Sequence, residues 1–205
     1  MERVIVRTPL FTHKMEKSYD FARKAVRTVL AEGFAPLSGP LLYGQEGLLD
    51  FDKATDFAVA NMALLAWKAV AQIIVIYPEL DNLSIRDQMF NLNVKRPEME
   101  RVIVESPYAG DVEANVNYAR ACARECLEKE EAPFLSHLLY TQPGILKDEV
   151  PEERQWGIDA GLTWGEVAQK TVVYQDLGVS NGMRYGIKNA ERAGRPIEFR
   201  NLGRK

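Results

Sequence analysis

The sequence predicts an α/β fold built as a tandem repeat, and three observations lead to this prediction. The hexapeptide Met1–Val6 recurs letter for letter as Met99–Val104. When residues 18–90 are shifted by 97 positions without a gap, 21 of the 73 pairs are identical, whereas chance gives about four or five at a background of roughly one in sixteen. Within each half, β-branched runs alternate with segments of helical periodicity, which indicates parallel sheets flanked by helices.

Each half opens with a predicted buried strand, at residues 4–6 and at residues 102–104. Thr-Pro or Ser-Pro follows, as expected where a strand enters a loop. In the second half, residues 112–129 are predicted to form a helix, because apolar and charged residues recur there at helical spacing. Residues 132–139 read as the second strand, and Pro133 is expected to mark its start.

The rest of the second half continues the same alternation. A loop rich in Pro, Gly and acidic residues precedes a second helix predicted over residues 152–169 and a third strand over 171–174. A third helix is predicted over residues 181–193, with Gly194 as its cap, and a fourth strand over residues 196–199. This element order is typical of flavodoxin- or Rossmann-like units.

The first half follows the same order as far as Ile76. Its third-helix segment, residues 81–90, runs directly into residues 91–98, so its last strand is short or missing. We therefore expect domains at residues 1–90 and 99–205, joined by a linker at 91–98. The alternative is a single three-layer domain in which the strands of both halves merge into one sheet.

Composition narrows the class of protein. At 46% apolar and 27% charged residues with a net charge of -3, the chain is predicted to be soluble and globular. It contains neither an apolar run of membrane-spanning length nor a recognisable signal peptide, so we expect a cytoplasmic protein without a membrane partner. No basic stripe is present, which argues against nucleic-acid binding. Cys122 and Cys126 stand four apart on one predicted helix, a spacing that favours two buried residues over a disulfide or a metal site.

Polar residues gather after the predicted strands of the second half, where ligands of open parallel sheets bind. The first strand is followed by Glu105, Ser106, Tyr108 and Gly110, the second by Ser136 and His137, and the third by Asp176 and the run Gly178–Gly182. This small-residue run leads into a helix. It reads either as a phosphate or carboxylate cradle or as a plain turn with Ser180 as N-cap.

The first half lacks this polar set. In the positions of Tyr108, Ser136, His137, Asp159, Ser180 and Gly182 it has Leu10, Gly39, Pro40, Met62, Leu83 and Ile85. The apolar pairs Trp67/Trp164, Leu65/Leu162, Tyr77/Tyr174 and Leu80/Leu177 persist, as core positions do. We therefore predict one functional site, in the second half, with the first half as a pseudo-partner.

Three side chains carry two interpretations each. His137 either hydrogen-bonds within its loop or belongs to the site, and no companion residues indicate that it binds a metal. Asp159 lies on a largely apolar helix, where it occupies either a cleft or the surface. Trp164 is read as a core residue in preference to a base-stacking platform.

The order of motifs in the second half resembles a known family. The sequence combines strand-Ser-Pro-Tyr-x-Gly, Asn115 in the first helix, Ser-His after the second strand, Gly-x-Asp in the second helix and Ser-x-Gly-Met opening the third. This pattern resembles the nucleoside 2-deoxyribosyltransferase-like superfamily, which includes 2′-deoxynucleoside 5′-phosphate N-hydrolases. The likeness covers residues 101–202 well and residues 3–90 only in their apolar skeleton, so the first half is a degenerate copy in this interpretation.

The resemblance implies cleavage or exchange of an N-glycosidic bond, without a cofactor or metal. A carboxylate attacks the sugar carbon through an oxocarbenium-like transition state, and a second acid assists the departing base. It further implies that Tyr108 and Gly110 border the sugar, that Asp159 faces the base or sugar, and that Ser180 with Gly182 holds a 5′-phosphate. The predicted substrate-binding set also contains Ser106, Asn115, His137, Asp176 and Arg184.

One departure from the family pattern leaves the activity open. Arg184 stands where the nucleophilic glutamate of the family is expected, and an arginine can bind phosphate but cannot attack carbon. Either Asp159 or Glu105 has taken over the chemistry, or the protein is a non-catalytic nucleotide sensor or sequestering module. A purely structural pseudo-dimer is the third hypothesis. Members of the family commonly work as dimers, so the first half would supply the neighbour within the chain, and a homodimer of the whole chain is a further alternative.

Overall fold

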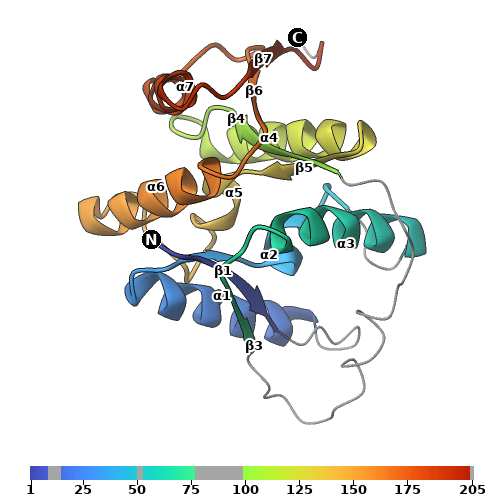
Figure 1. The fold of residues 1–205 in the computed structure, drawn as a ribbon, viewed down its shortest axis with the longest axis vertical. Helices are drawn as coiled ribbons and strands as arrows, with labels where there is room; N and C mark the ends of the chain where they lie inside the picture. Colours follow the sequence, from blue (N-terminus) through green and yellow to red (C-terminus); the bar gives the residue numbers. More distant parts are fainter. Residues whose placement is uncertain (9–14, 50–52, 77–98, 204–205) are drawn as a thin grey trace.

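The structure is a computed structural model that describes residues 1–8, 15–49, 53–76 and 99–203 (Figure 1). The first half contributes a parallel sheet of strands β1 (Arg3–Arg7), β2 (Ala35–Leu37) and β3 (Ile73–Ile76), in the order β2-β1-β3. The second half contributes a parallel sheet in the order β5-β4-β6-β7. Its strands are β4 (Glu100–Glu105), β5 (Glu131–Phe134), β6 (Lys170–Tyr174) and β7 (Ile197–Arg200).

Helices connect the strands, as parallel pairing requires. The first half has α1 (Met15–Ala31), α2 (Gly39–Tyr43) and α3 (Ala54–Lys68). The second half has α4 (Val112–Glu128), α5 (Ser136–Leu139), α6 (Pro151–Gly165) and α7 (Asn181–Arg192). The predicted α/β class, with parallel sheets flanked by helices, is therefore confirmed. The first-half segment 81–90 and the predicted linker 91–98 lie outside the described residues.

Three details of the second-half prediction were wrong. Residues 136–139 form the short helix α5 and not the end of a strand, because β5 ends at Phe134. Pro133 does not start β5 but lies inside it, which an edge strand tolerates because one side of its ladder is unpaired. The second helix also ends early, at Gly165 in place of residue 169.

The described strands of the two halves belong to separate sheets, which contradicts the alternative of one merged sheet. The halves are nevertheless joined by one continuous apolar core. Helix α3 of the first half packs on β5, and α6 of the second half packs on β2, so each half lends a helix to the other (Figure 1). At the centre, the rings of Trp67 and Trp164 meet edge to face with centroids 5.6 Å apart.

Hydrogen bonds across this interface come in pairs whose members are 97 residues apart in the sequence. Trp67 Nε1 donates to the carbonyl of Ala132 at 3.1 Å, and Trp164 Nε1 donates to the carbonyl of Ala35 at 3.2 Å. Three further pairs of side-chain donors and backbone carbonyl acceptors follow the same rule. Tyr43 donates to Pro133 (3.0 Å) and Tyr140 to Pro36 (2.7 Å), while Gln45 donates to Leu138 (2.9 Å) and Gln142 to Leu41 (2.7 Å). Arg124 donates to Leu48 (2.9 Å), and Arg27 donates to Ile145. Such mutual contacts between equivalent patches are the pattern of a two-fold interface.

The apolar residues that are identical in the two halves differ in their burial. Trp67, Trp164 and Tyr174 are fully buried, as predicted, whereas Leu65 is 45% exposed and Leu177 is 53% exposed. The prediction that Leu65 and Leu177 are core residues was therefore wrong, whereas Leu162 is half-buried. Tyr77 and Leu80 lie outside the described part of the chain. Cys122 and Cys126 are buried free thiols on α4, as their spacing predicted.

In the part of the chain that the structure describes, none of the helices combines the length and the apolar character needed to cross a membrane.

Candidate functional site

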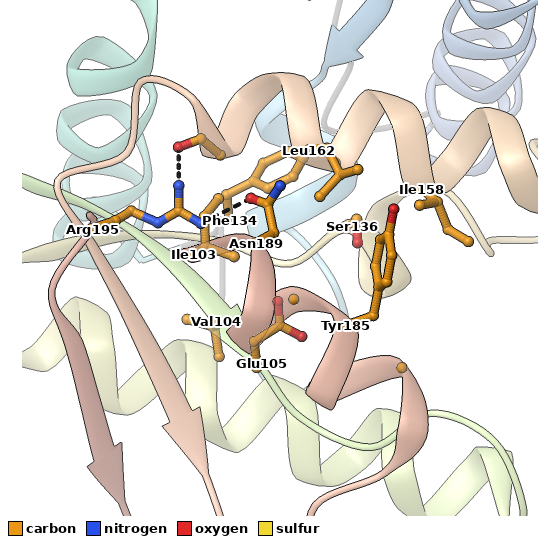
Figure 2. Close-up of a pocket in the computed structure, with 14 residues that line it drawn as sticks. Ile103, Val104, Glu105, Phe134, Ser136, Ile158, Leu162, Tyr185, Asn189 and Arg195 are labelled. Carbon is orange, nitrogen blue, oxygen red and sulfur yellow. Dashed lines mark hydrogen bonds between the residues drawn. The ribbon is translucent and has the colours of Figure 1, made fainter. Parts of the chain in front are cut away.

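A hollow lies in the second half between α6 and α7, over the carboxyl end of β4 (Figure 2). It encloses about 100 Å³. Its floor comes from strand and loop residues, and its walls come from one face of each helix, where the lining residues recur three or four positions apart. The lining consists of Ile103, Val104, Glu105, Phe134, Ser136, Ile158, Gly161, Leu162, Gly165, Gly182, Tyr185, Gly186, Asn189 and Arg195.

Glycines keep this space open. A Cβ built on Gly161 would lie 3.0 Å from the Cβ of Ser136, which is tighter than ordinary van der Waals contact. A Cβ on Gly186 would overlap the carboxylate of Glu105, so that carboxylate lies directly against the backbone of α7. These positions therefore need glycine for close approach and not for an unusual backbone angle.

Glu105 is the one carboxylate among the residues that line the hollow. It is partly buried at the end of β4, and no group in the described ranges donates a hydrogen bond to it. Burial raises its pKa to about 7, and the positive charge of Arg195 offsets part of this rise. A carboxyl with this pKa exchanges its proton near neutral pH, which is the property that acid, base or nucleophilic roles require.

Arg195 borders the opposite end of the hollow and ties three elements together. Its Nε donates to Thr171 Oγ1 at 2.8 Å, and its two terminal nitrogens donate to the Gly165 carbonyl at 2.5 Å and to Asn189 Oδ1 at 3.5 Å (Figure 2). Burial lowers the pKa of Arg195, and the nearby Glu105 raises it. This guanidinium therefore holds α6, α7 and β6 in place while compensating the charge of Glu105.

A second group of predicted residues surrounds the loop after β4 without lining the hollow. The hydroxyl of Ser106 lies 2.9 Å from His137 Nε2, and the rings of Tyr108 and His137 are in contact with centroids 6.2 Å apart. Asn115 donates to the carbonyls of Tyr108 and Ala109 at 3.0 and 2.9 Å. Burial lowers the pKa of His137 to about 4, so its imidazole is neutral at physiological pH. Gly110 sits in this loop with a φ of 99°, which a side chain would strain.

The structure does not bring Asp159 or Arg184 to the hollow. Asp159 accepts a hydrogen bond from Gln155 at 2.7 Å and does not line the hollow, although Leu162, about one helical turn later, does. Arg184 is exposed on α7 and is likewise absent from the lining. Glu105 and Asp159 were predicted as alternative nucleophiles, and of these two carboxylates only Glu105 lines the hollow.

Asp176 and Ser180 have clear structural partners. The Asp176 carboxylate accepts hydrogen bonds from Tyr118 Oη at 2.6 Å and from the backbone N–H groups of Leu202 and Gly203 at 2.9 and 3.1 Å. Burial raises the pKa of Asp176, but these donors outweigh burial and lower it overall. Ser180 caps α7 by accepting from the Met183 N–H at 3.3 Å, as the plain N-cap interpretation predicted. Gly182, next in the first turn, does line the hollow.

Sequence reasoning missed several lining residues, namely Ile158, Gly161, Leu162, Tyr185, Gly186, Asn189 and Arg195. A signal for most of them was present. On α7 the spacing Gly182, Tyr185, Gly186, Asn189 places two glycines and two polar side chains on one helical face, which is an unusual composition for a packed face. Across the described residues, no cluster of three or more His, Cys, Asp or Glu side chains could hold a metal ion.

Comparison with known proteins found one family model that is similar to part of the chain. Residues 100–200, the segment that contains the hollow, match the family described as Domain of unknown function (DUF7768). Neither the curated proteins nor the solved structures yielded a match.

Proposed function

We propose that this protein acts on the N-glycosidic bond of a nucleoside or a nucleoside 5′-monophosphate, with Glu105 as the attacking carboxylate. The observation that carries the proposal is the environment of Glu105. Its carboxylate faces a hollow at the carboxyl edge of a parallel sheet, where such folds bind ligands, and it receives no hydrogen bond from a described residue. A structural carboxylate in the same chain, Asp176, is by contrast saturated with donors.

The chemistry follows from a retaining mechanism. Ionised Glu105 attacks C1′ of the sugar and forms an ester bond while the bond from C1′ to the base breaks, and the electron pair departs with the base, which takes up a proton. Water then cleaves the ester and regenerates the carboxylate, or a second base attacks C1′ in a transfer reaction. Burial favours this role, because a carboxylate without hydrogen bonds is a stronger nucleophile than a solvated one.

The substrate class rests on the resemblance of residues 101–202 to the nucleoside 2-deoxyribosyltransferase-like superfamily. Under this proposal the loop of Tyr108 and Gly110 borders the sugar, and its shape is held by Asn115 and by the contact between Ser106 and His137. The N-terminus of α7, with Ser180 and Gly182, attracts a 5′-phosphate through its exposed N–H groups, and Arg184 adds a positive charge to the same turn.

The same proposal treats the chain as a tandem repeat of two flavodoxin/Rossmann-like units. Support comes from the matching start of the strand orders, β2-β1-β3 and β5-β4-β6, and from interface hydrogen bonds that recur with a 97-residue offset. In this interpretation the first unit is a degenerate copy that replaces the second subunit of a dimer.

A second candidate function is non-catalytic nucleotide binding. The hollow contains one carboxylate, so a second acid to protonate the departing base is missing from its described lining. A sensor or sequestering protein needs no such acid.

Incubation with 2′-deoxynucleosides, nucleosides and their 5′-monophosphates separates these functions. Released base is measured by chromatography, and retained ligand is measured by thermal shift. We expect release by the wild-type protein and a loss of at least about 10³-fold in Glu105→Gln, because an amide cannot attack C1′. Glu113→Gln, an exposed change on α4, is the matched control and should retain the wild-type rate.

Two outcomes would count against catalysis by Glu105. If ligands stabilise the protein without release of base, the chain is a nucleotide binder. If base is released equally fast by Glu105→Gln, another residue is the nucleophile.

A further inference from the structure

Tyr185 is a large aromatic residue that α7 presents at the rim of the hollow. It is 52% exposed, and no aromatic ring contact is found for it among the described residues. Figure 2 shows its ring standing beside Ile158 of α6, with Leu162 farther along the same helix. The rim therefore offers a flat aromatic face with aliphatic neighbours, open to solvent.

The size of the hollow limits what can enter it. Its volume of about 100 Å³ is smaller than the cavity of roughly 150 Å³ that accommodates a benzene molecule. A bicyclic base is larger than this space, and the hollow is open to solvent on one side. For a sugar whose C1′ reaches Glu105, the open side at the rim is the place that accommodates a base of that size.

Geometry assigns the base to Tyr185. Glu105 lies on the floor of the hollow, and its carboxylate lies against Gly186 of α7. Tyr185 directly precedes Gly186 in the chain and is an aromatic residue that lines the same hollow. The adjoining Gly186 lets the Glu105 carboxylate lie directly against the backbone of α7. Every nucleobase has a π face, and stacking on an aromatic side chain is its most general mode of recognition.

We propose that Tyr185, supported by Ile158, is the base-binding platform of this site and its specificity-determining residue. This inference rests on the proposed function, since it takes a nucleoside as the ligand. A stacking platform favours bases with the larger π surface, so the site should bind purine nucleosides more tightly than pyrimidine nucleosides.

The test compares three variants of the full chain against deoxyadenosine and thymidine. Dissociation constants are measured by equilibrium dialysis, and KM is measured where base is released. Tyr185→Ala should weaken deoxyadenosine binding by about 5- to 100-fold, the range expected for loss of one stacked base, and should weaken thymidine binding less. Tyr185→Phe keeps the aromatic face and should stay within about twofold of wild type.

Phe199→Ala is the matched control, because Phe199 is 54% exposed on β7 and does not line the hollow. It should leave both affinities unchanged. The platform is refuted if Tyr185→Ala behaves like Phe199→Ala, or if Tyr185→Phe loses as much affinity as Tyr185→Ala.

The outcome for base release is read separately. Binding that depends on Tyr185 without release of base would leave the platform standing while refuting catalysis. Release of base that does not depend on Tyr185 would support catalysis and refute the platform. A wild-type protein that binds neither nucleoside would refute both the platform and catalysis.

Discussion

At one pair of equivalent positions, the two halves differ in which residue carries the large side chain. In the first half, a Cβ on Gly39 would lie 2.8 Å from Cδ2 of Leu64, so Leu64 fills the space beside that glycine. In the second half, 97 residues later, Ser136 and Gly161 take their places, and Gly161 leaves the space open. At these positions, Leu64 on the face of α3 corresponds to Gly161 on the face of α6.

The framework around these two places is the same. The reciprocal hydrogen bonds of Trp67 and Trp164 have nearly equal lengths, 3.1 and 3.2 Å. Packing between the halves is thus held constant while the two cavity positions differ. This contrast teaches that the two halves differ in small local volumes while the hydrogen bonds between them are retained.

The largest effect is expected from Gly161→Leu, which gives the second half the side chain that closes the first. Since a Cβ alone would already lie 3.0 Å from the Cβ of Ser136, the leucine must displace its neighbours and occupy the hollow. We expect at least a roughly 100-fold loss of nucleoside affinity, measured by equilibrium dialysis, and a destabilisation of about 1–3 kcal/mol in urea unfolding.

The double variant Ser136→Gly with Gly161→Leu separates the two consequences. It reproduces the pairing of Gly39 and Leu64, so most of the lost stability should return while affinity stays low. Recovered affinity would show that the ligand binds outside this hollow.

The rate of base release should change about tenfold per pH unit on the acid side of its profile. In the proposed mechanism an ionised Glu105 is the attacking group, and burial raises its pKa to about 7, so base release should rise with pH through 7 and fall about tenfold for each unit below it. The folded state also retains a proton that the unfolded chain, with a carboxyl pKa of 4.5, has already released.

The sign of the effect on stability follows from this difference. Stability should decrease as pH rises from about 4.5 to about 7, since the folded state binds more protons in that window. Glu105→Gln should remove this component, which urea unfolding of both proteins across the pH range will show. Equal pH slopes would mean that Glu105 has an ordinary pKa.

A smaller and symmetric effect is expected for the two interface tryptophans. Trp67→Phe and Trp164→Phe each remove one buried hydrogen bond, to the carbonyl of Ala132 or of Ala35, and part of the ring packing at the interface. Each should cost about 1–3 kcal/mol, and the two losses should agree within about 1 kcal/mol in chemical unfolding. A large difference would show that the halves contribute unequally to the shared core.

The sequence predicted the framework of the fold better than the site. Strong hydrophobic periodicity located β4, α4, β6 and α7 with errors of one or two residues. It failed at residues 136–139, because a short apolar run in a helical turn has the same composition as the end of a buried strand.

The site was harder to predict because cavities form where side chains are absent. Glu105 was among the predicted residues, but Gly161 and Gly186 were not, and their effect depends on the neighbours that a Cβ would meet. Likewise Asp176 follows a strand, as a ligand-binding residue should, yet its donors come from α4 and from residues 202–203, which sequence spacing does not reveal.

Asp159 provides the smallest predicted effect and the sharpest test of the contrast between carboxylates. Family resemblance makes it a catalytic candidate, whereas its hydrogen bond to Gln155 and its absence from the hollow make it a surface residue of α6. Asp159→Asn should therefore change base release and nucleoside affinity by less than about twofold, because the amide can keep a hydrogen bond at this position. A loss comparable to that of Glu105→Gln would mean that α6 rotates to bring Asp159 to the substrate, and the hollow described above would then be a closed form of a larger site.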